Sequence, residues 1–462
     1  MRELFNAFDD TWIVDGLRTP QVDYLGAFAD ANPIDLGIKA GRALLARTGV
    51  EAARIDTVLA GNMAPGGFDQ FYVARHIGLY CGVPLEVPAL ALQRICGTGF
   101  ELFRQAGMQL ASGGERVLLV GTESMTRNPI AAFDHRGGFR LGAPIGFRDY
   151  MWEALTDPAT GVSMIRTAEN LAQRYGITRA QVDAFASRSF ARAVAAQADG
   201  WFDDEIVAVR SERFELDGYR PRGIRLAGRV EVVERDTHPR PSSPEVLARL
   251  RPVYEDGVQT GGNSSALTDA AAAALVARGS ALDGRRPLAR LAAVTVAGVP
   301  PEIMGIGPAP AIRALLQRSG LALGDIARFE VNEAQGAQTL AVARELGLDE
   351  ERLNVHGGAI ALGHPLAATG VRLTITLARQ LRAAGARWGV AAACIGGGQG
   401  IALLVENTEA AMSAAHGRSE AALPTVRLAG RTGAAGARQS AGTAAGPALP
   451  LGEPSVARRV VQ

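Results

Sequence analysis

The strongest constraint on the fold is an internal repeat, in which two distant segments follow the same order of helix and strand. Thr98-Gly99 opens a stretch with helical spacing, and Thr369-Gly370 opens another, at an offset of 369 − 98 = 271 residues. The same offset moves the apolar strand Arg116–Gly121 onto Arg387–Ala392, which has the composition of a second buried strand. Two unrelated α/β segments can be aligned by chance. A register that holds over both helix and strand nevertheless predicts two similar halves related by a pseudo-twofold axis.

Within each half, short apolar runs alternate with stretches of helical period, which places the chain in the α/β class. Asp56–Gly61 and Ile326–Val331 are predicted to be equivalent buried strands. The first strand is expected at Thr11–Asp15, followed by a turn at Gly16–Pro20, and a capped, alanine-rich helix is expected to start at Asn263. In such sheets the functional side chains are expected at the carboxyl ends of the strands.

Between Met125 and Tyr254 the alternation weakens, and arginine, proline and aromatic residues become more frequent. We interpret this segment as an insertion that covers the site. The predicted boundaries are 1–124 for the N-terminal half, 125–256 for the inserted loop domain, 257–279 for the return to the N-terminal half, 280–406 for the C-terminal half and 407–462 for a tail. The tail is rich in Ala, Gly and Arg, and we expect it to be disordered because it has little apolar surface to bury.

Composition argues against several other classes of protein. The formal net charge of the 462 residues is +1, which does not indicate a surface for nucleic acid. No apolar run approaches the length of a membrane span, and the acidic residues near the N-terminus are not typical of a signal or transit peptide. The three widely spaced cysteines fit neither a disulfide framework nor a zinc-ligand pattern. We therefore expect a cytoplasmic protein without a metal or a membrane partner.

A glycine-rich stretch at 354–370 contains the residue best suited to proton transfer. His364 lies between Gly363 and Pro365, and Pro365 suits the first position of the apolar helix that follows. A histidine at the start of a buried helix can accept and return protons near neutral pH. The alternative is a structural glycine-rich turn with an incidental histidine.

Two of the three cysteines are candidates for the chemistry. Cys96 follows a strand and opens a helix, where unpaired N–H groups and the helix dipole favour a thiolate. Cys394 follows a buried strand and precedes Gly396–Gly398, whose backbone N–H groups could face an anionic oxygen. The alternatives are an inert buried thiol at Cys96, which we expect for Cys81, and a phosphate-binding glycine turn after Cys394.

Asn332 follows the predicted strand that ends at Val331, where its side chain could hold a water molecule or a carbonyl oxygen. The alternative is a helix N-cap, which is common for Asn. Asn332, Cys96, Cys394 and His364 would all lie at the carboxyl ends of strands or at the starts of the helices that follow. Two thiols and one imidazole without a metal favour acyl transfer with carbon–carbon chemistry, in which one thiol carries the acyl group and the other moves a proton at carbon.

Nine short segments together carry a family resemblance. They are Arg18-Thr-Pro, Arg94-Ile-Cys-Gly-Thr-Gly, Gly121-Thr-Glu-Ser-Met, Thr167-Ala-Glu-Asn, Gly262-Asn-Ser-Ser, Met304-Gly-Ile-Gly-Pro, Asn332-Glu-Ala, Gly357-Gly-Ala-Ile-Ala-Leu-Gly-His-Pro and Cys394-Ile-Gly-Gly-Gly-Gln-Gly. From about residue 11 to 406 the chain resembles the thiolases, which include acetyl-CoA acetyltransferases and 3-ketoacyl-CoA thiolases. The resemblance implies the thiolase fold, with two halves built on five-stranded mixed sheets and a loop domain that covers coenzyme A.

The resemblance also implies an acyltransferase that cleaves 3-ketoacyl-CoA with free CoA, or runs the reverse Claisen condensation. Cys96 would be the nucleophile that forms an acyl-cysteine intermediate, His364 would activate it, and Cys394 would exchange a proton with the acetyl methyl group. Two alternatives stay open at this point. One is a ketosynthase-like condensing enzyme, against which Cys394 argues, and the other is a non-catalytic thiolase-fold protein that binds acyl-CoA or lipid.

Further roles follow from the same resemblance. One oxyanion hole would combine His364 with a water molecule held by Asn332, and the other would use the backbone N–H groups of Cys96 and Gly396. Ser265 would contact the pantetheine arm of coenzyme A. CoA thioesters would enter as substrates, and no other cofactor is implied.

Arg240 would lie near the adenine nucleotide end of coenzyme A. The family implies a homodimer or homotetramer. The segments that start at Arg240 and Asn263 resemble the β-subunits of fatty acid oxidation, which would be compatible with an α-subunit partner. Four places depart from the family: Gln335, where Phe is usual, Ile165, where Gly is usual, Ser163, which is His in some biosynthetic members, and Ala367-Ala-Thr, where Gly-Ala-Ser is common. The first three would line or border the acyl pocket, so they leave the acyl chain length open.

Overall fold

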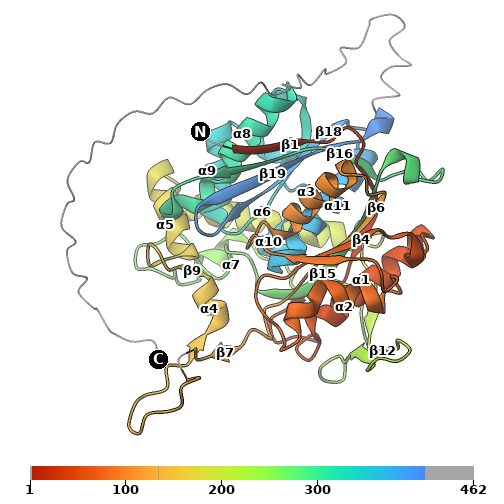
Figure 1. The fold of residues 1–462 in the computed structure, drawn as a ribbon. Helices are drawn as coiled ribbons and strands as arrows, with labels where there is room; N and C mark the ends of the chain where they lie inside the picture. The colour runs from red at the N-terminus through yellow and green to blue at the C-terminus, as the bar shows by residue number, and fades with distance from the viewer. Residues whose placement is uncertain (1–2, 134, 411–462) are drawn as a thin grey trace, which may run out of the picture. The chain divides into compact units, whose positions relative to one another are not determined.

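A mixed β-sheet made of two half-sheets is the largest feature of the computed structural model, which describes residues 3–133 and 135–410 (Figure 1). The N-terminal half-sheet contains, in spatial order, β5 (Ala89–Leu92), β4 (Thr57–Gly61), β6 (Arg116–Ser124), β15 (Thr268–Ala277) and β2 (Trp12–Arg18), with the short β3 (Val22–Asp23) beside β15. The C-terminal half-sheet contains β17 (Ile326–Val331), β18 (Trp388–Ile395), β19 (Gln399–Glu406), β16 (Ala289–Gly298) and β1 (Glu3–Ala7). The half-sheets meet where β2 pairs with β16, at Ile13 opposite Ala289.

The two half-sheets share one strand order, which confirms the predicted repeat. β4 runs parallel to β6 as β17 runs parallel to β18, and the antiparallel strands β15 and β2 correspond to β19 and β16. The fifth strand differs, because β5 extends the N-terminal half beside β4 whereas β1 extends the C-terminal half beside β16. The expectation of two five-stranded mixed sheets is confirmed, and pairing between β2 and β16 joins them into one.

Helices cover the outer face of each half-sheet and fill the space between the two (Figure 1). α1 (Pro33–Thr48) and α2 (Val73–Tyr80) pack on the N-terminal half-sheet, and α8 (Pro308–Ser319) packs on the C-terminal one. α3 (Thr98–Ala111) and α11 (Leu366–Ala383) lie between the half-sheets, where both contact strands of each. The predicted helix that follows His364 is therefore present, and it is buried in the central layer.

α3 and α11 occupy equivalent places in the two halves, and they cross at a pair of glycines. A Cβ atom on Gly370 would lie 2.3 Å from the backbone nitrogen of Phe100, and one on Gly99 would lie 2.6 Å from the backbone nitrogen of Val371. The two helix backbones are thus in direct contact at the glycines that the repeat places in register. This contact fixes the starts of the two helices relative to each other.

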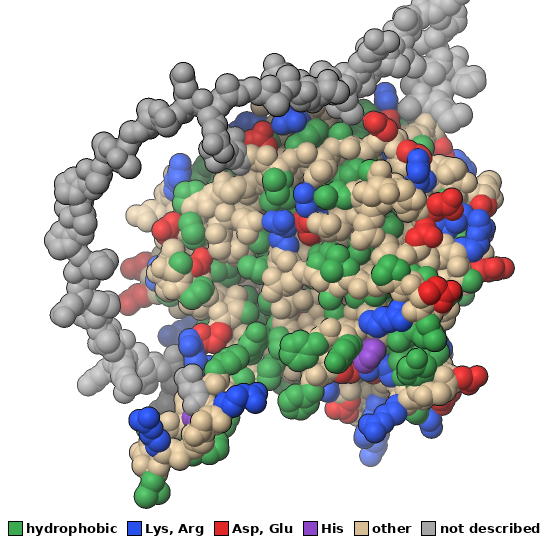
Figure 2. Space-filling view, viewed as in Figure 1, with side chains coloured by type: hydrophobic (Ala, Val, Ile, Leu, Met, Phe, Trp, Pro, Cys, Tyr) green, Lys and Arg blue, Asp and Glu red, His purple; other side chains and the backbone are tan. Residues whose placement is uncertain are grey.

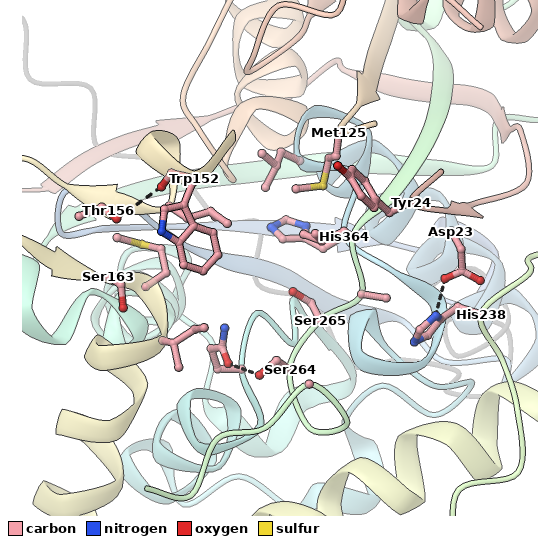
Figure 3. A pocket seen from close by; sticks show the side chains of 18 residues that line it. Asp23, Tyr24, Met125, Trp152, Thr156, Ser163, His238, Ser264, Ser265 and His364 are labelled. Carbon is pink, nitrogen blue, oxygen red and sulfur yellow. Dashed lines mark hydrogen bonds and ion pairs between the residues drawn. The ribbon is translucent and has the colours of Figure 1, made fainter. Parts of the chain in front are cut away.

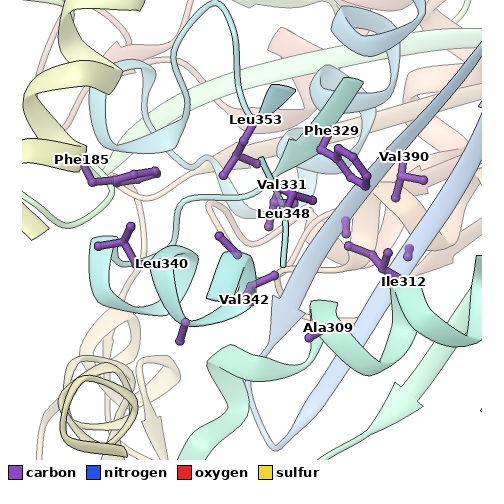
Figure 4. Packing of buried hydrophobic residues seen from close by; sticks show 14 of the residues in the cluster. Phe185, Ala309, Ile312, Phe329, Val331, Leu340, Val342, Leu348, Leu353 and Val390 are labelled. Atoms are coloured by element: carbon purple, nitrogen blue, oxygen red, sulfur yellow. The ribbon is translucent and has the colours of Figure 1, made fainter. Parts of the chain in front are cut away.

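The apolar core follows the same layers. One cluster fills the space between the half-sheets and includes Phe100 and Leu373, while a second lies between α1, α2 and the N-terminal half-sheet. A third lies on the outer side of the C-terminal half-sheet, where Phe329 of β17 joins Ile312 of α8 and Leu340 of α9 (Gly336–Leu346) (Figure 4). Each such side chain contributes about 1.5–3 kcal/mol when it is fully buried. The central helices α3 and α11 are therefore stabilised by apolar contacts with both half-sheets.

The inserted segment lies between β6 and β15 of the N-terminal half and combines short strands with helices of different lengths. They are β7 (Ile130–Ala131), β8 (Arg148–Asp149), α4 (Tyr150–Ala154), β9 (Thr156–Asp157), β10 (Val162–Ser163), α5 (Met164–Tyr175), α6 (Arg179–Ala198), β11 (Val209–Arg210), β12 (Glu212–Phe214), β13 (Arg222–Ile224), β14 (Val232–Val233) and α7 (Pro244–Ala248). Arg18 at the end of β2 is buried and pairs with Glu205 at 2.9 Å and Asp236 at 2.6 Å. Breaking such a pair leaves an uncompensated buried charge, so these contacts hold the segment to the central strands.

Two local predictions are wrong. Residues 268–277 form strand β15 rather than an alanine-rich helix, because they pair with β6 and β2 and are buried along their whole length. Pairing on both sides and the close packing of α1 and α11 override the helix propensity of alanine. β2 continues to Arg18 instead of turning at Gly16, where a Cβ would meet Ile375 of α11 at 2.2 Å. The domain boundaries stay predictions, and the predicted disorder of residues 411–462 lies outside the described residues.

The surface shows no region of one charge sign on the face drawn in Figure 2, where acidic and basic side chains are interspersed. This distribution agrees with the formal net charge of +1. Across residues 3–133 and 135–410, every helix is too short or too polar to cross a membrane.

Candidate active site

Cys96 lies in a tight turn between β5 and α3. Ile95 has a φ of 45°, a left-handed conformation that typically costs about 1–3 kcal/mol for a residue other than glycine. The Thr98 hydroxyl holds this turn, because it accepts a hydrogen bond from the Arg94 N–H group at 2.8 Å and donates to the Ile95 carbonyl at 2.7 Å. The turn aims Cys96 into a buried space at the start of α3, where the residue is 9% exposed.

Burial also controls the ionisation of Cys96. It raises the pKa of the Cys96 thiol to about 11, while the backbone N–H groups of Gly396 and of Cys96 itself lower the pKa only in part. The prediction that the helix start favours a thiolate is therefore outweighed by desolvation. A neighbouring base is needed to remove the proton before the sulfur can act as a nucleophile.

Gly396 lies in the turn between β18 and β19, whereas Cys394 lies near the end of β18, opposite Gly400 of β19. Because the Gly396 N–H group lies close enough to lower the pKa of Cys96, two backbone donors converge at that sulfur. Cys394 is fully buried and packs against Met304 and Ala334. Burial, together with the nearby Cys96 thiol, raises the pKa of Cys394, which places the two sulfurs in one site. Cys81 lies apart from them, and burial raises its pKa to about 12, as expected for an inert thiol.

His364 lies between the short helix α10 (Ala359–Leu362) and α11. Its Nδ1 atom lies 2.7 Å from Thr369 Oγ1, which also lies 3.0 Å from the carbonyl oxygen of Pro365. The threonine hydroxyl carries one proton, so both contacts are satisfied when it donates to Pro365 and accepts from the His364 Nδ1–H group. Nε2 is then the unprotonated nitrogen. Burial lowers the pKa of His364 to about 3, so the imidazole is neutral in the resting site.

Asn332 contacts the same histidine. It is fully buried directly after β17, and its Nδ2 atom lies 3.3 Å from His364 Nε2. Its Oδ1 atom is buried without a hydrogen-bond partner within the described ranges. Because α9 has Gln335 rather than Asn332 as its N-cap, the alternative role of Asn332 as a helix cap is wrong.

Replacing Thr369 by valine is expected to lower kcat by about 10- to 100-fold, because His364 loses the acceptor that fixes its tautomer and orientation. Valine keeps the shape of the side chain, and Thr369→Ser keeps the hydroxyl and should stay close to the wild-type rate. Steady-state kinetics of the acyl transfer that the sequence resemblance implies would measure both variants. A valine variant with the wild-type kcat would show that Thr369 does not position the histidine.

A cavity of about 460 Å³ reaches this group of residues (Figure 3). His364 lines it together with Met125 and Leu366, and these last two side chains pack against Cys96. The inserted segment supplies much of the remaining wall, with the side chains of Trp152, Leu155, Thr156, Ser163, Met164, Ile165 and His238. The insertion therefore borders the site, as the sequence predicted.

Ser265 and Arg240 differ in their relation to this cavity. Ser265 lines it, on the loop before β15. Arg240 does not line it: the guanidinium is exposed, lies 5.3 Å from the ring centroid of Phe190 and contacts His238, which is part of the wall. Of the predicted site residues, His364 and Ser265 line the cavity. Cys96 and Cys394 lie behind its wall, in the apolar clusters that contain or contact the lining residues Met125, Leu366 and Met164. Arg240 lies just outside.

Glu123 is a buried residue of the site to which the sequence analysis gave no role. Its carboxylate accepts hydrogen bonds from the N–H groups of Met63 at 3.0 Å, Ala64 at 3.2 Å and Ala367 at 3.1 Å. Met63 packs against the apolar cluster that contains Cys96, and Ala367 lies in the first turn of α11. Burial raises the pKa of Glu123 to about 7. The signal in the sequence that could have pointed to Glu123 is an acidic residue at the end of a continuous apolar strand.

Known proteins resemble this chain over most of its length. Family models for the thiolase N-terminal and C-terminal domains match residues 11–280 and 285–407. The mitochondrial 3-ketoacyl-CoA thiolase of Bos taurus is 40% identical over 402 residues, which cover 86% of this chain and 98% of the relative. The acetyl-CoA acetyltransferase of Syntrophomonas wolfei is 37% identical over 404 residues, which cover 85% of this chain and 98% of the relative. The crystal structure of human mitochondrial 3-ketoacyl-CoA thiolase in complex with CoA is 39% identical, with a TM-score of 0.80 over 86% of this chain and 98% of that chain.

Fold and site together define an α/β enzyme in which an imidazole lines a cavity and two buried thiols lie behind its wall. The family models cover most of the chain, and the relatives exceed 30% identity over nearly their full length. The chain belongs to the thiolase family, and it is an acyltransferase.

Proposed function

We propose that this chain cleaves 3-ketoacyl-CoA with free CoA, and runs the reverse Claisen condensation, through an acyl-Cys96 intermediate. The observation that carries the proposal is the grouping of the buried Cys96 and Cys394 thiols behind the wall of the cavity that His364 lines, with two backbone N–H groups at the Cys96 sulfur. The names of the relatives support this reaction, and the CoA complex of the human structure supports coenzyme A as a substrate. A ketosynthase-like enzyme or a non-catalytic binding protein is not favoured by these relatives.

In the first half-reaction, neutral His364 takes the proton of Cys96, and the thiolate attacks the C3 carbonyl of the substrate. The N–H groups of Cys96 and Gly396 would hold the oxyanion that forms, and loss of one such donor typically raises the barrier by about 3 kcal/mol. The C2–C3 bond then breaks, which leaves the acyl group on Cys96 and releases an acetyl-CoA enolate.

Cys394 would give its proton to carbon C2 of this enolate. Its raised pKa keeps it protonated until then, and His364 with a water molecule held by Asn332 would stabilise the enolate oxygen. The unpartnered Oδ1 of Asn332 supports such a water site. Free CoA next returns a proton to Cys394 and attacks the acyl group. Cys96 leaves as a thiolate and recovers its proton from His364.

The test is thiolysis by the purified full chain, with free CoA and 3-ketoacyl-CoAs of increasing chain length. Loss of ketoacyl absorbance should be catalysed by the wild type and should fall to background in Cys96→Ala, which cannot form the acyl intermediate. The preferred chain length would assign the substrate. Acyl-CoA binding without turnover at any length would overturn the proposal in favour of a binding protein.

We further propose a homodimer or homotetramer, a cytoplasmic location, and an α-subunit of fatty acid oxidation as an additional partner. The edge strand β5 and the turn that leads into the adjoining helix α2 support self-association, because Leu90 on β5 is 47% exposed and Phe71 in that turn is 89% exposed. The three free cysteines support a reducing compartment. Light scattering of the purified chain, alone and with a candidate α-subunit, would measure the assembly. A monomer in both samples would contradict it.

A further inference from the structure

Gln335 is a buried amide that lines the cavity and has unused donors. It is 8% exposed and lies at the start of α9, on the cavity wall. Its Oε1 atom accepts hydrogen bonds from Ser264 Oγ at 2.6 Å and from Gln259 Nε2 at 3.0 Å (Figure 3 marks the first at Ser264). Its Nε2 atom has no hydrogen-bond partner within residues 3–133 and 135–410.

The orientation of this amide follows from the backbone. The Ala337 N–H group can only donate, and it donates to Gln259 Oε1 at 2.9 Å. Gln259 must therefore present its NH2 group toward Gln335, which must present its oxygen in return. The NH2 group of Gln335, with two N–H donors, is consequently the part of the side chain left for the cavity.

Two neighbouring hydroxyls on this wall already have hydrogen-bond partners. The Thr156 hydroxyl donates to the Trp152 carbonyl at 3.4 Å, and Ser163 Oγ lies 2.7 Å from Tyr254 Oη. The wall between them is mostly apolar, with side chains of Leu155, Met164, Ile165, Leu267 and Leu366, and the Ser265 hydroxyl is a further polar group on it. An unpaired donor in such surroundings costs free energy until an acceptor reaches it.

The charges at the cavity indicate what kind of acceptor would fit. Asp23 and His238, which also line it, pair with each other at 2.5 Å. His364 is neutral, because burial lowers its pKa to about 3. A carboxylate in the cavity would therefore lack a counter-ion, whereas a neutral oxygen would need only the amide donors.

We infer that the acyl chain of the natural substrate carries a neutral oxygen acceptor that binds the Gln335 NH2 group. This inference rests on the proposed thiolysis, which it narrows from plain 3-ketoacyl-CoAs to those with an ester, ether, hydroxyl or keto oxygen further along the chain. A site built to bond a substrate oxygen discriminates against the analogue that lacks it, because its own donor is then left unpaired.

The experiment compares kcat/KM for pairs of 3-ketoacyl-CoAs with equal numbers of chain atoms. One member of each pair ends in a methyl ester, as in the methyl ester of 3-ketoadipyl-CoA, and the other is the straight-chain compound, as in 3-ketooctanoyl-CoA. Methyl esters whose acyl chains are one and two carbons longer than that of 3-ketoadipyl-CoA test at which position along the chain the oxygen acceptor must lie. The wild type should prefer the ester of one length by about 10-fold, the scale of one hydrogen bond. Free 3-ketoadipyl-CoA, with a carboxylate, should be a poorer substrate than its ester.

Two variants assign any preference to Gln335. Gln335→Met removes the donor at similar length and should abolish the preference while the straight-chain compound is still cleaved. Gln335→Glu keeps an oxygen toward Gln259 and Ser264, replaces the NH2 group by oxygen, and should also lose the preference. Equal rates for both members of every pair in the wild type would overturn the inference but leave thiolysis established. A wild-type preference that survives in Gln335→Met would overturn it as well.

Discussion

Replacing Cys394 by alanine is expected to abolish thiolysis while leaving the exchange of labelled CoA with acetyl-CoA in place. Exchange needs only the acyl-carrying thiol and its base, whereas cleavage of the C2–C3 bond also needs a proton at C2. General acid catalysis typically contributes about 10²- to 10⁴-fold, so we expect thiolysis to fall by at least about 10³-fold. Both rates would be measured on the same preparation, with acetyl-CoA and labelled CoA for exchange and a 3-ketoacyl-CoA for cleavage.

The three cysteines of the chain supply matched controls for this experiment. Cys96→Ala should lose both activities, because no acyl-enzyme can form. Cys81→Ala should keep both, since its sulfur lies against the backbone of α1, 3.7 Å from the Ile38 carbonyl. Loss of exchange in Cys394→Ala, in a variant that still folds, would show that Cys394 takes part in acyl transfer rather than in proton transfer alone.

The second large effect is expected on stability, at the crossing of α3 and α11. In Gly370→Ala the added methyl group would lie 2.3 Å from the backbone nitrogen of Phe100, and a backbone atom cannot rotate away as a side chain can. Both helices are held between two half-sheets, so neither can move aside without disturbing the core. Overpacking typically costs about 1–3 kcal/mol, and we expect a loss of unfolding free energy at the upper end of this range or beyond.

Denaturant unfolding of the full chain would measure this loss. Gly99→Ala should behave in the same way, because its Cβ would meet Val371 and Ala367 backbone atoms at 2.6 and 2.7 Å. Gly324→Ala is the control, since that glycine is exposed and has no atom within 4 Å of the added carbon. If Gly370→Ala unfolded at the same denaturant concentration as the control, the two helices would not be in the tight contact described.

Helices with strong local signals were predictable from the sequence. α1 begins where the Asn32 side chain accepts a hydrogen bond from the Ile34 N–H group and ends at Gly49 in the left-handed conformation. α6 begins at a capping box on Thr178. The alanine-rich strand β15 was not predictable in this way, because its conformation comes from partners far away in the chain. Alanine favours a helix in the absence of tertiary contacts, whereas here pairing with β6 and β2 imposes the strand conformation.

The candidate site likewise contains some residues that are predictable from local sequence and others that depend on distant contacts. Cys96, His364 and Cys394 carry reactive groups beside glycines, which is a pattern visible in sequence. The left-handed conformation of Ile95 and the carboxylate of Glu123 depend on contacts between segments that no local pattern encodes. The ionisation of Cys96 was also misjudged, because the cost of burial is a property of the packed site and exceeds the benefit of the helix start.

The position of β15 in the sheet has a consequence for how the chain is made. β15 lies between β6 and β2, and its residue Ala272 pairs with Arg18, 272 − 18 = 254 residues earlier. As the nascent chain leaves the ribosome, the edge of β6 therefore stays open while the whole insertion is synthesised. β1, near the N-terminus, must wait still longer for its partner β16. Contacts of such long sequence separation form slowly and leave strand edges exposed to other chains. Chaperone demand should consequently be highest before residue 277 is complete, so that early truncation products aggregate rather than accumulate as folded halves.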